Sequence, residues 1–481
     1  MLPHSQTPLL QATPSTMNPP QFTATLLTGL SKITAAVEDI IGAAANPTAK
    51  TLTLQICDRK SKGKPRRLRA VTLNEDGIQQ LGSGSCTEVA ALFNSTTRRK
   101  MLVIVNPVSG TKSGVNLWRH KCQPILEAAH VECVEMITTG EAHATNIIQQ
   151  LTAEEMSSYD GIVAVGGDGI LYEIIAGFMK REDWMTSLQN TPVAIVPAGS
   201  GNGLALSILH RKGETRDVES MAYLIARGDV SPMDLCSVES SSQRSISFLS
   251  TEWALASDID ITSEKYRCCG DFRFTCRGIE LVFCDGCVRK YAGTLHYLPI
   301  ANDGGSGGSG SSGSSGSSDV ETGSSKETTG ETKGVDASDV SAQTTTLHEL
   351  QTLLPPVHES IGEEHRLRGW KTLEGKDWQY FIAMQTTHQA SDMYGAPGSE
   401  LDDGTIMLCF GKNVSCAPCT MTSWLCNMED GSHLAMDACQ TLQVRAFRLV
   451  PEAGIIAVDG ERVPLEPTQV EVHKGMMRIF C

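Results

Sequence analysis

The sequence predicts an α/β protein, in which an N-terminal doubly wound parallel-sheet domain precedes a C-terminal β-sandwich domain that is interrupted by a disordered insertion. Three observations lead to this fold class. Continuous apolar runs alternate with helix-like segments over residues 98–230, shorter strands of alternating polarity follow, and a stretch of low sequence complexity divides those later strands. The chain has 481 residues, 40% of them hydrophobic, which is enough for about two or three domains.

The start of the chain is expected to lie outside the two domains. Residues 1–50 are predicted to form a mostly disordered tail, because proline, threonine and serine dominate its first part. Residues 22–45 have apolar residues at helical spacing, which favours a short amphipathic helix. Such a helix would pack on the protein, remain weakly ordered or anchor the chain to a membrane.

Residues 51–97 are predicted to form a lead-in with a strand, a basic turn and a second strand. The turn holds the densest positive cluster of an acidic protein. It fits a solvated loop, and it also fits attraction to anionic lipid headgroups, which contributes up to about 1 kcal/mol per basic residue. The cluster consists of Arg59, Lys60, Lys62, Lys64, Arg66, Arg67 and Arg69.

The first domain, residues 98–230, is predicted from four apolar runs separated by helix-like segments. The runs are residues 101–107, 131–138, 161–167 and 191–199. Strands that are apolar throughout, with helices between them, are typical of a parallel sheet covered on both faces.

The second domain, residues 231–300 and 347–481, is predicted to be β-rich because its apolar segments are short and frequently broken by turns. Residues 301–346 interrupt it with glycine, serine and threonine and without apolar periodicity. They are expected to form a disordered surface insertion that has no catalytic part.

Bulk composition excludes some partners. The net charge of −15 and the pI near 5.3 oppose binding to a phosphate backbone, so nucleic acid is not expected as a partner. No stretch approaches the ~20 apolar residues of a membrane-spanning helix, and the N-terminus lacks the pattern of a secretory signal. The protein is therefore expected to be cytoplasmic, with reversible recruitment to membranes.

The 16 cysteines are expected to be reduced thiols rather than a disulfide framework, because the chain is long and carries no secretory signal pattern. Two CxxC pairs, Cys284 with Cys287 and Cys416 with Cys419, leave a four-thiolate zinc site as an alternative. The sequence does not establish which residues would bind any other metal.

Three glycine-bearing turns each follow an apolar strand of the first domain, at residues 106–114, 166–169 and 197–205. The carboxyl ends of parallel strands meet at one edge of a sheet, where ligands bind. Glycine lets the backbone approach phosphate oxygens, and free N–H groups at helix N-termini favour their charge. The turns match neither a Walker P-loop nor the GxGxxG of a dinucleotide fold, so they indicate a phosphate site of another arrangement.

Asp168 is the most informative side chain, because it lies between glycines at the start of a predicted helix. The helix dipole favours a carboxylate there, so an N-cap is one interpretation. Beside a bound phosphate the same residue would be a base that positions an acceptor hydroxyl, or a Mg²⁺ ligand. Glu173 follows on the same helix and is expected to support metal binding or orient a basic partner.

The turns NPVSGTKSG, VAVGGDGILYEIIAGF and VPAGSGNGLA are similar to the three nucleotide-site motifs of the diacylglycerol-kinase catalytic-domain family. The segments SPMDL, WALASDIDITSEKYRCCGDFRFT and AVDGE resemble its sphingosine-kinase branch. The resemblance covers about residues 98–300 and 365–481. It implies an α/β nucleotide domain and a β-sandwich, with the active site of a lipid kinase in the cleft between them, and it implies ATP and Mg²⁺.

The resemblance also assigns roles to single residues. Asp168 matches the catalytic aspartate that takes the acceptor proton. Asp260 matches an acid that binds the lipid, together with the turn of Gly166, Gly167 and Gly169. The residues that match the nucleotide site are Asn106, Pro107, Val108, Thr138, Thr139, Gly140, Glu141, Ala142, Glu173, Gly199, Ser200, Gly201, Asn202, Arg267, Arg273, Asp459, Gly460 and Glu461.

Asp258 and Asp260 favour a sphingoid base as the lipid. Such a base carries an ammonium group beside its primary hydroxyl, and a carboxylate near the acceptor favours that cation. Each aspartate is otherwise a solvated residue of a strand end or turn. The predicted reaction transfers the γ-phosphoryl group of ATP to the primary hydroxyl and gives sphingosine 1-phosphate from sphingosine.

Two alternatives remain open at this point. A ceramide or diacylglycerol kinase is the nearest, since diacylglycerol kinases also have glycine at the position of Gly166. A regulator that binds lipid or nucleotide without catalysis is the alternative of another class. The expected partners are the lipid substrate and a peripheral membrane surface, and a homodimer is left open.

Overall fold

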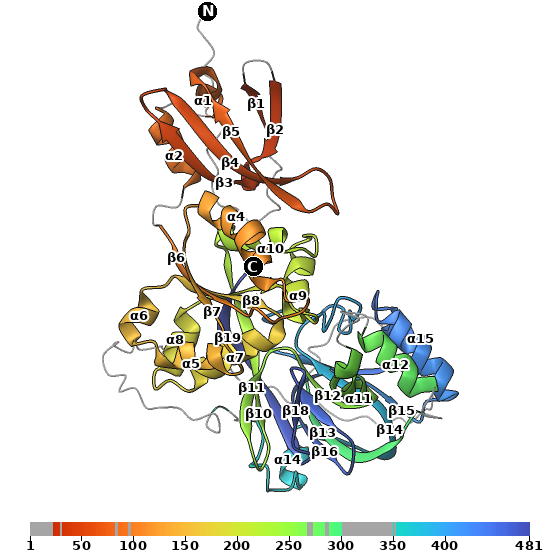
Figure 1. The fold of residues 1–481 in the computed structure, drawn as a ribbon. Helices are drawn as coiled ribbons and strands as arrows, with labels where there is room; N and C mark the ends of the chain where they lie inside the picture. Colours follow the sequence, from red (N-terminus) through yellow and green to blue (C-terminus); the bar gives the residue numbers. More distant parts are fainter. Residues whose placement is uncertain are drawn as a thin grey trace, which may run out of the picture.

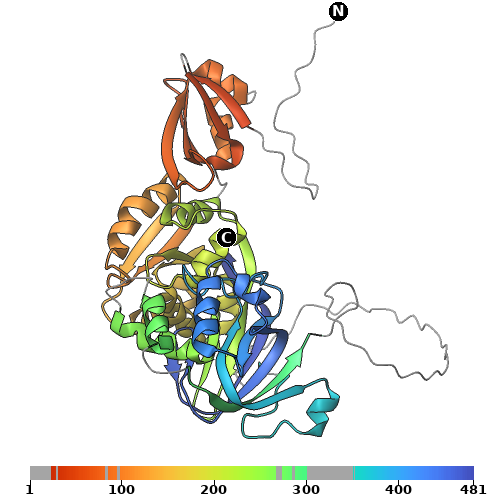
Figure 2. The same ribbon diagram turned by 90° about the vertical axis from the view of Figure 1, so that its right-hand side faces the viewer.

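The computed structural model describes residues 23–28, 31–81, 85–94, 98–266, 273–283, 288–300, 350 and 353–481. The chain forms three parts that follow one another along the molecule (Figure 1 and Figure 2). A small sheet with two helices lies at one end, an α/β part in the middle and a β-rich part at the other end. The predicted insertion, residues 301–346, falls outside the described residues. Among the helices that are described, none is both long enough and apolar enough to cross a membrane.

The N-terminal part differs from the predicted tail and amphipathic helix. Its elements are β1 (Thr23–Thr28), β2 (Ser31–Ala36), β3 (Ile40–Asn46), β4 (Thr51–Arg59), β5 (Arg66–Leu73), α1 (Glu75–Leu81) and α2 (Cys86–Phe93). The segment expected to be a helix runs instead as strands, with β1 paired to β2 and β3 paired to β4. Helical spacing was misleading because the segment divides into strands of six or seven residues, over which helical and strand periods are hard to tell apart, and because its threonine and isoleucine side chains are β-branched and favour strands. The prediction of a tail is therefore wrong for residues 23–28 and 31–50.

β3, β4 and β5 form an antiparallel sheet with a small core of its own. Alternate residues of β4, namely Leu52, Leu54 and Ile56, are fully buried. They pack with apolar residues of α1 and α2, as the period of two in a half-buried strand requires. The basic turn joins β4 to β5, at the edge of this sheet.

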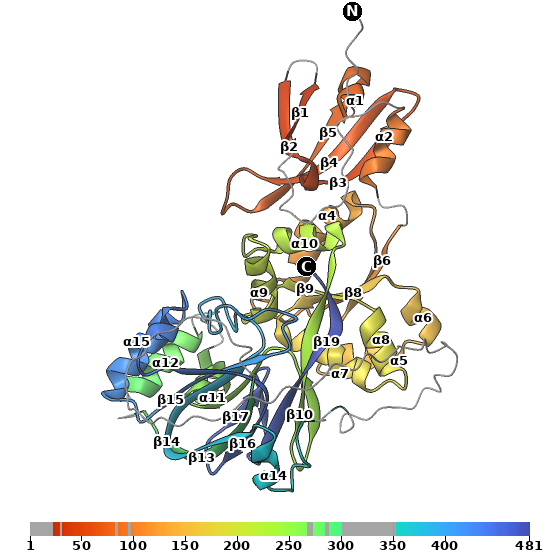
Figure 3. The ribbon, with the colours of Figure 1, turned by 180° about the vertical axis from the view of Figure 1, so that it is seen from behind.

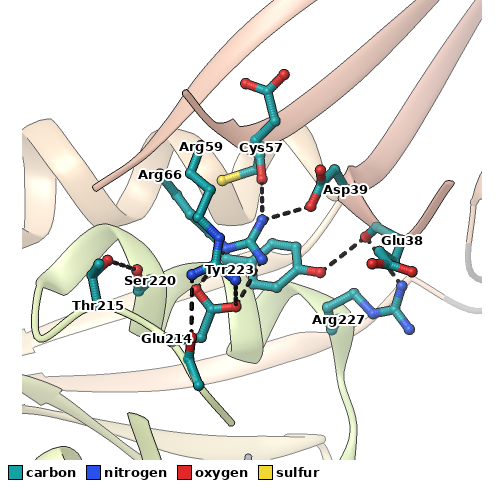
Figure 4. A network of polar contacts seen from close by, with 12 residues as sticks. Glu38, Asp39, Cys57, Arg59, Arg66, Glu214, Thr215, Ser220, Tyr223 and Arg227 are labelled. Carbon is teal, nitrogen blue, oxygen red and sulfur yellow. Dashed lines mark hydrogen bonds and ion pairs between the residues drawn. The ribbon is translucent and has the colours of Figure 1, made fainter. Parts of the chain in front are cut away.

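One buried arginine joins the N-terminal sheet to the α/β part. Arg66 is 5% exposed, and its guanidinium forms ion pairs with Glu214 and Asp39, each at 2.7 Å. It also donates to the carbonyl oxygen of Cys57 at 2.6 Å and lies 3.5 Å from the centre of the Tyr223 ring (Figure 4). Arg66 is therefore part of an internal contact and does not belong to a solvated loop. Two more members of the basic cluster pair with carboxylates, namely Arg59 and Arg69.

The middle part is a parallel sheet with helices on both faces, which confirms the predicted α/β class. Its strands are β6 (Lys100–Val105), β7 (Glu132–Ile137), β8 (Gly161–Gly166) and β9 (Val193–Pro197), in the order β9–β8–β6–β7. One face carries α3 (Gly114–Leu117), a π-helical turn (Trp118–Cys122), α4 (Gln123–Ala128), α9 (Gly203–Arg211) and α10 (Val218–Arg227). The other carries α5 (His143–Gln150), α6 (Ala153–Ser157), α7 (Asp168–Met179) and α8 (Trp184–Asn190).

The β-rich part wraps its strands around an aromatic core. Its strands are β10 (Val230–Glu239), β11 (Arg244–Ser247), β12 (Ser250–Ala254), β13 (Tyr291–Pro299), β14 (Lys371–Met384), β15 (Ile406–Lys412), β16 (Gln440–Pro451), β17 (Ile456–Val458), β18 (Glu461–Val463) and β19 (Thr468–Phe480). Its helices include α11 (Leu255–Thr262), α12 (Arg273–Phe283), α14 (Glu363–Leu367) and α15 (Ala417–Asn427). Because β14 and β16 change partners along their length, the sheet folds back on itself. The enclosed core includes Trp253, Trp378, Phe381, Phe410 and Phe447.

Two long strands fix the β-rich part to the α/β part. β19 pairs antiparallel with β10 and β16, and Ile479 near its end pairs parallel with Val193 of β9. Figure 3 shows β10 and β19 running from one part into the other. Backbone hydrogen bonds therefore continue from the parallel sheet into the second part, and they hold the two walls of the candidate site together.

Candidate functional site

A cavity of about 1390 Å³ lies between the α/β part and the β-rich part. The turns that follow β6, β7, β8 and β9 line it, so it lies at the carboxyl edge of the parallel sheet, where open α/β folds bind ligands. The opposite wall comes from α11, the start of α12, and the loops at residues 389–393 and 459–461.

Most residues that the sequence assigns to the site line this one cavity. They are Asn106, Pro107, Val108, Thr138, Thr139, Gly140, Glu141, Ala142, Gly167, Asp168, Gly169, Glu173, Gly199, Ser200, Gly201, Asp260, Arg273, Asp459, Gly460 and Glu461. Gly166 and Asn202 belong to the same turns but do not line the cavity. Arg267 falls outside the described residues.

The glycine turns pack backbone against backbone. A Cβ atom on Gly199 would lie 2.3 Å from the Cα of Gly167, and one on Gly110 would lie 2.7 Å from the carbonyl oxygen of Ala198. Both distances are far inside van der Waals contact, so larger residues do not fit there. Asn202 shapes the third turn instead of facing the cavity: its amide accepts from the N–H of Gly199 at 2.9 Å and donates to the carbonyl of Gly199 at 2.7 Å.

Asp168 is the first residue of α7 and is 9% exposed. Gly167 is the N-cap of α7, and the Asp168 carboxylate caps α9 instead. Its Oδ2 accepts from the N–H of Gly203 at 2.6 Å, and Oδ1 from the N–H of Leu204 at 3.2 Å. Burial raises the pKa of Asp168 to about 6, although the two N–H donors oppose the rise. A positioned carboxylate with a pKa near neutrality suits a general base.

Glu173 holds the turn between β7 and α5. Its Oε2 accepts from the N–H of Ala144 at 3.1 Å, in the first turn of α5. The hydroxyl of Thr145 donates to the backbone carbonyl of Glu173 at 2.8 Å. Glu173 therefore anchors a turn whose residues line the cavity, in addition to lining the cavity itself.

Asp260 and Asp258 lie on helix α11 and are buried, which differs from the solvated strand end or turn considered from the sequence. Asp260 lines the cavity, and its Oδ2 is buried without a hydrogen-bond partner. Burial raises the pKa of Asp260 to about 7, while the charge of Arg273 opposes the rise. Arg273 also forms an ion pair with Glu264. Asp258 accepts from the hydroxyl of Tyr291 and does not line the cavity.

Asp459 is saturated by hydrogen bonds within the protein. Its carboxylate accepts from the hydroxyl of Ser247 at 2.8 Å and from the N–H groups of residues 248–250, each at 3.0 Å. Burial raises the pKa of Asp459 to about 6, against the effect of these donors. Asp459 thus anchors the turn between β11 and β12, and it places Gly460 and Glu461 against the cavity.

Four further residues at or behind the cavity wall were not predicted from the sequence. Lys112 lines the cavity, and Ser109 accepts from the N–H of Gly167 at 3.1 Å. Both lie in the first glycine turn, where a phosphate site needs a cation and a hydroxyl, so the motif contained the signal. Gln389 lines the cavity and donates to Glu252, which is 1% exposed. No local sequence pattern identifies Gln389 or Glu252, because only the fold brings β12 and the loop after β14 together.

The described residues contain no group of three or more His, Cys, Asp or Glu side chains that is arranged to hold a metal ion. Cys416 and Cys419 are exposed free thiols at the start of α15. Cys284 and Cys287 fall outside the described residues, so the zinc alternative stays a prediction.

Comparison with known proteins adds to this geometry. The family model "Diacylglycerol kinase catalytic domain" matches residues 100–238. Sphingosine kinase 1 of Homo sapiens is 30% identical over 384 residues, which are 78% of this chain and 88% of that protein. Sphingosine kinase 1 of Arabidopsis thaliana is 30% identical over 371 residues, 76% of this chain and 68% of that protein. The chain also resembles a solved structure titled as a putative diacylglycerol kinase from Bacillus anthracis str. Sterne, with a TM-score of 0.50. The alignment covers 80% of this chain and 98% of the solved chain at 16% sequence identity, so it shows similarity of fold alone.

Proposed function

The chain belongs to the sphingosine kinase family, and from this premise we propose that it transfers the γ-phosphoryl group of ATP to the primary hydroxyl of a sphingoid base, sphingosine or dihydrosphingosine. Sphingosine gives sphingosine 1-phosphate. The observation that carries the proposal is that two buried carboxylates, Asp168 and Asp260, line the same cavity as the glycine turns. Asp168 would take a proton beside the phosphate site, and Asp260 would bind an ammonium group.

Asp168 is the proposed general base. The oxygen of the primary hydroxyl attacks the γ-phosphorus of ATP, the bond to the β-phosphate oxygen breaks, and ADP leaves. The hydroxyl proton passes to the carboxylate of Asp168. The N–H groups of Gly203 and Leu204 use one lone pair on each carboxylate oxygen and fix its orientation, and the remaining lone pairs accept the proton. With a pKa of about 6, this carboxylate is mostly ionised at neutral pH.

The glycine turns and the start of α7 are the proposed cradle for the triphosphate, through their backbone N–H groups. Among the described residues, the Lys and Arg side chains that line the cavity are those of Lys112 and Arg273. Carboxylates outnumber them, so a triphosphate needs a further cation in the cavity. The carboxylates are those of Glu141, Asp168, Glu173, Asp260, Glu264, Asp459 and Glu461.

Mg²⁺ fits this donor set. In proteins it is held by one or two carboxylates together with substrate phosphates, so it does not require a preformed cluster of three side chains. Glu461 is the carboxylate that we propose to hold it, which leaves Asp168 to act as the base. When bound, it would supply positive charge that neutralises the transferring phosphoryl group.

Asp260 is the basis for the proposed choice of lipid. The ammonium of a sphingoid base offers Oδ2 a charged donor, and this pair would lower the pKa of Asp260 below about 7. Ceramide has a neutral amide and diacylglycerol has no nitrogen. Either lipid would leave Oδ2 of this buried carboxylate without a charged hydrogen-bond donor, which is unfavourable.

We assign the nucleotide to the α/β part and the lipid to the β-rich part. Reversible contact with a membrane is proposed because the lipid substrate resides in one, and a cytoplasmic location is proposed because ATP is available there. The homodimer stays a prediction.

A substrate panel tests the proposal. Purified protein with ATP and Mg²⁺ is offered sphingosine, dihydrosphingosine, ceramide and diacylglycerol in mixed micelles, with the Asp260→Asn variant in parallel. We expect kcat/KM for the two bases to exceed that for the neutral lipids by about 100-fold, and Asp260→Asn to remove most of this preference, because a neutral amide forms no charged pair. Preferred turnover of ceramide or diacylglycerol would overturn the substrate. ATP binding without turnover of any lipid would instead support the non-catalytic regulator.

A further inference from the structure

Two buried hydrogen-bond acceptors at the cavity have no partner within the protein. One is Oδ2 of Asp260, and the second is Oε1 of Gln389, in the loop that follows β14. A buried acceptor without a donor is unfavourable, and most such atoms in folded proteins are paired. Each of the two therefore points to a donor that a ligand brings.

The carboxamide of Gln389 is held in one orientation. Its Nε2 donates to Oε1 of Glu252, and the same oxygen accepts from the hydroxyl of Ser250 at 3.0 Å. Glu252 lies on β12 and is 1% exposed, so this contact is shielded from water. Because Oε1 of Glu252 acts as an acceptor, the amide nitrogen of Gln389 faces it, and not the amide oxygen. The carbonyl oxygen of Gln389 is consequently the atom that is left for a ligand.

Gln389 lies close to Asp168 and lines the same cavity as Asp260. Its backbone carbonyl oxygen is 2.7 Å from the position that a Cβ on Gly203 would occupy, and the N–H of Gly203 donates to Asp168. Its side chain contacts Glu252. Burial raises the pKa of Glu252 well above its usual range, and the charge of Asp260 raises it further.

We propose that Gln389 is a specificity-determining residue, whose Oε1 accepts a hydrogen bond from the secondary hydroxyl of a sphingoid base while Asp260 binds the adjacent ammonium group. A sphingoid base carries its primary hydroxyl, ammonium and secondary hydroxyl on three successive carbons. Three acceptors of the cavity, on Asp168, Asp260 and Gln389, match these three donors. Glu252 is a positioning residue, because it acts through Gln389. The inference rests on the proposed function and adds the recognition of a third polar group.

The test compares dihydrosphingosine with its 3-deoxy analogue, which lacks only the secondary hydroxyl. We expect the wild-type protein to prefer dihydrosphingosine by about 10- to 100-fold in kcat/KM, the usual effect of leaving one buried acceptor unpaired. In Gln389→Leu the ratio should fall to near one, through loss of activity on dihydrosphingosine. Glu252→Leu is the second variant. It removes the acceptor oxygen that orients Gln389, so it should reduce the ratio without changing KM for ATP.

Gln385→Leu is the matched control. Gln385 also has a buried Oε1 without a partner, and its Nε2 donates to the hydroxyl of Ser247 at 3.0 Å, but it does not line the cavity. Its replacement should change the activity on both substrates by the same factor. Equal use of the two bases by the wild-type protein, or a full preference retained in Gln389→Leu, would overturn the inference and leave the proposed function intact. Turnover of neither base would overturn both.

Discussion

Replacing Asp168 with asparagine should remove catalysis and loosen helix α9 at the same time. The carboxylate accepts from the N–H groups of both Gly203 and Leu204. Asparagine has one acceptor oxygen, so its amide nitrogen must face one of these N–H groups, which then loses its partner. The loss of a cap interaction costs about 0.5–2 kcal/mol, and burial places this case toward the upper end.

The effect on rate should be much larger than the effect on stability. A positioned general base contributes about 10²- to 10⁴-fold, and asparagine cannot take the proton of the substrate hydroxyl. We expect kcat of Asp168→Asn to fall at least about 100-fold. ATP affinity should change much less than kcat, because the contacts of Gly167 with Gly199 and Ser109 do not involve this carboxylate.

The assay measures kcat with a sphingoid base at saturating ATP, ATP binding at equilibrium, and the midpoint of thermal unfolding. Ser207→Ala is the control. The hydroxyl of Ser207 donates to the carbonyl of Gly203 at 2.8 Å and accepts from the N–H of His388 at 3.0 Å, so its loss weakens the same helix start and leaves the carboxylate in place. A near-normal kcat for Asp168→Asn, or an equal loss of kcat in Ser207→Ala, would refute the base role.

Three further predictions concern pH, domain attachment and the glycine turns. Because burial raises the pKa of Asp168 to about 6 and the pKa of Asp260 to about 7, the ionised forms of both are gained as pH rises, and kcat/KM should increase through about pH 6 to 7 before it levels off; a profile that is flat from about pH 5 to 7 would contradict this. Arg66→Met leaves two carboxylates without their buried cation and should destabilise the N-terminal sheet by about 3–5 kcal/mol, and unchanged hydrogen-exchange protection there would contradict it. Gly199→Ala places a Cβ 2.3 Å from the Cα of Gly167 and should abolish ATP binding, whereas Gly362→Ala, with open space at its Cβ, should bind ATP normally.

The phosphate side of the cavity could be predicted because its residues are local in the sequence. Each glycine turn comes directly after an apolar strand, and parallel strands bring their carboxyl ends to one edge. Knowing the strands was therefore enough to place Asn106, Asp168 and Gly199 together. The N-terminal part was not predictable in this way, because short apolar segments fit helix and strand periods alike. Residues 40–46 form the strand β3 because they pair with β4, which lies later in the sequence.

The lipid side depends on contacts that are distant in the sequence. Asp260 could be singled out only by resemblance, and its unpaired oxygen is a property of the folded cavity. Glu252 and Gln389 lie on separate segments that meet because β12 pairs with β14. Propensity and spacing describe one segment at a time, so a hydrogen bond between two such segments leaves no local pattern.

Asp168 shows how topology changes the meaning of a motif. An aspartate after two glycines suggests a cap on its own helix, yet β8 and β9 are neighbouring parallel strands, so the helices that follow them begin side by side. The carboxylate of Asp168, at the start of α7, accepts from the first N–H groups of α9. Those N–H groups are thus used to hold the proposed base and are not available to phosphate. The triphosphate must then rely on the N–H groups of the turns themselves, and base and nucleotide can share the edge of the sheet without competing for the same donors.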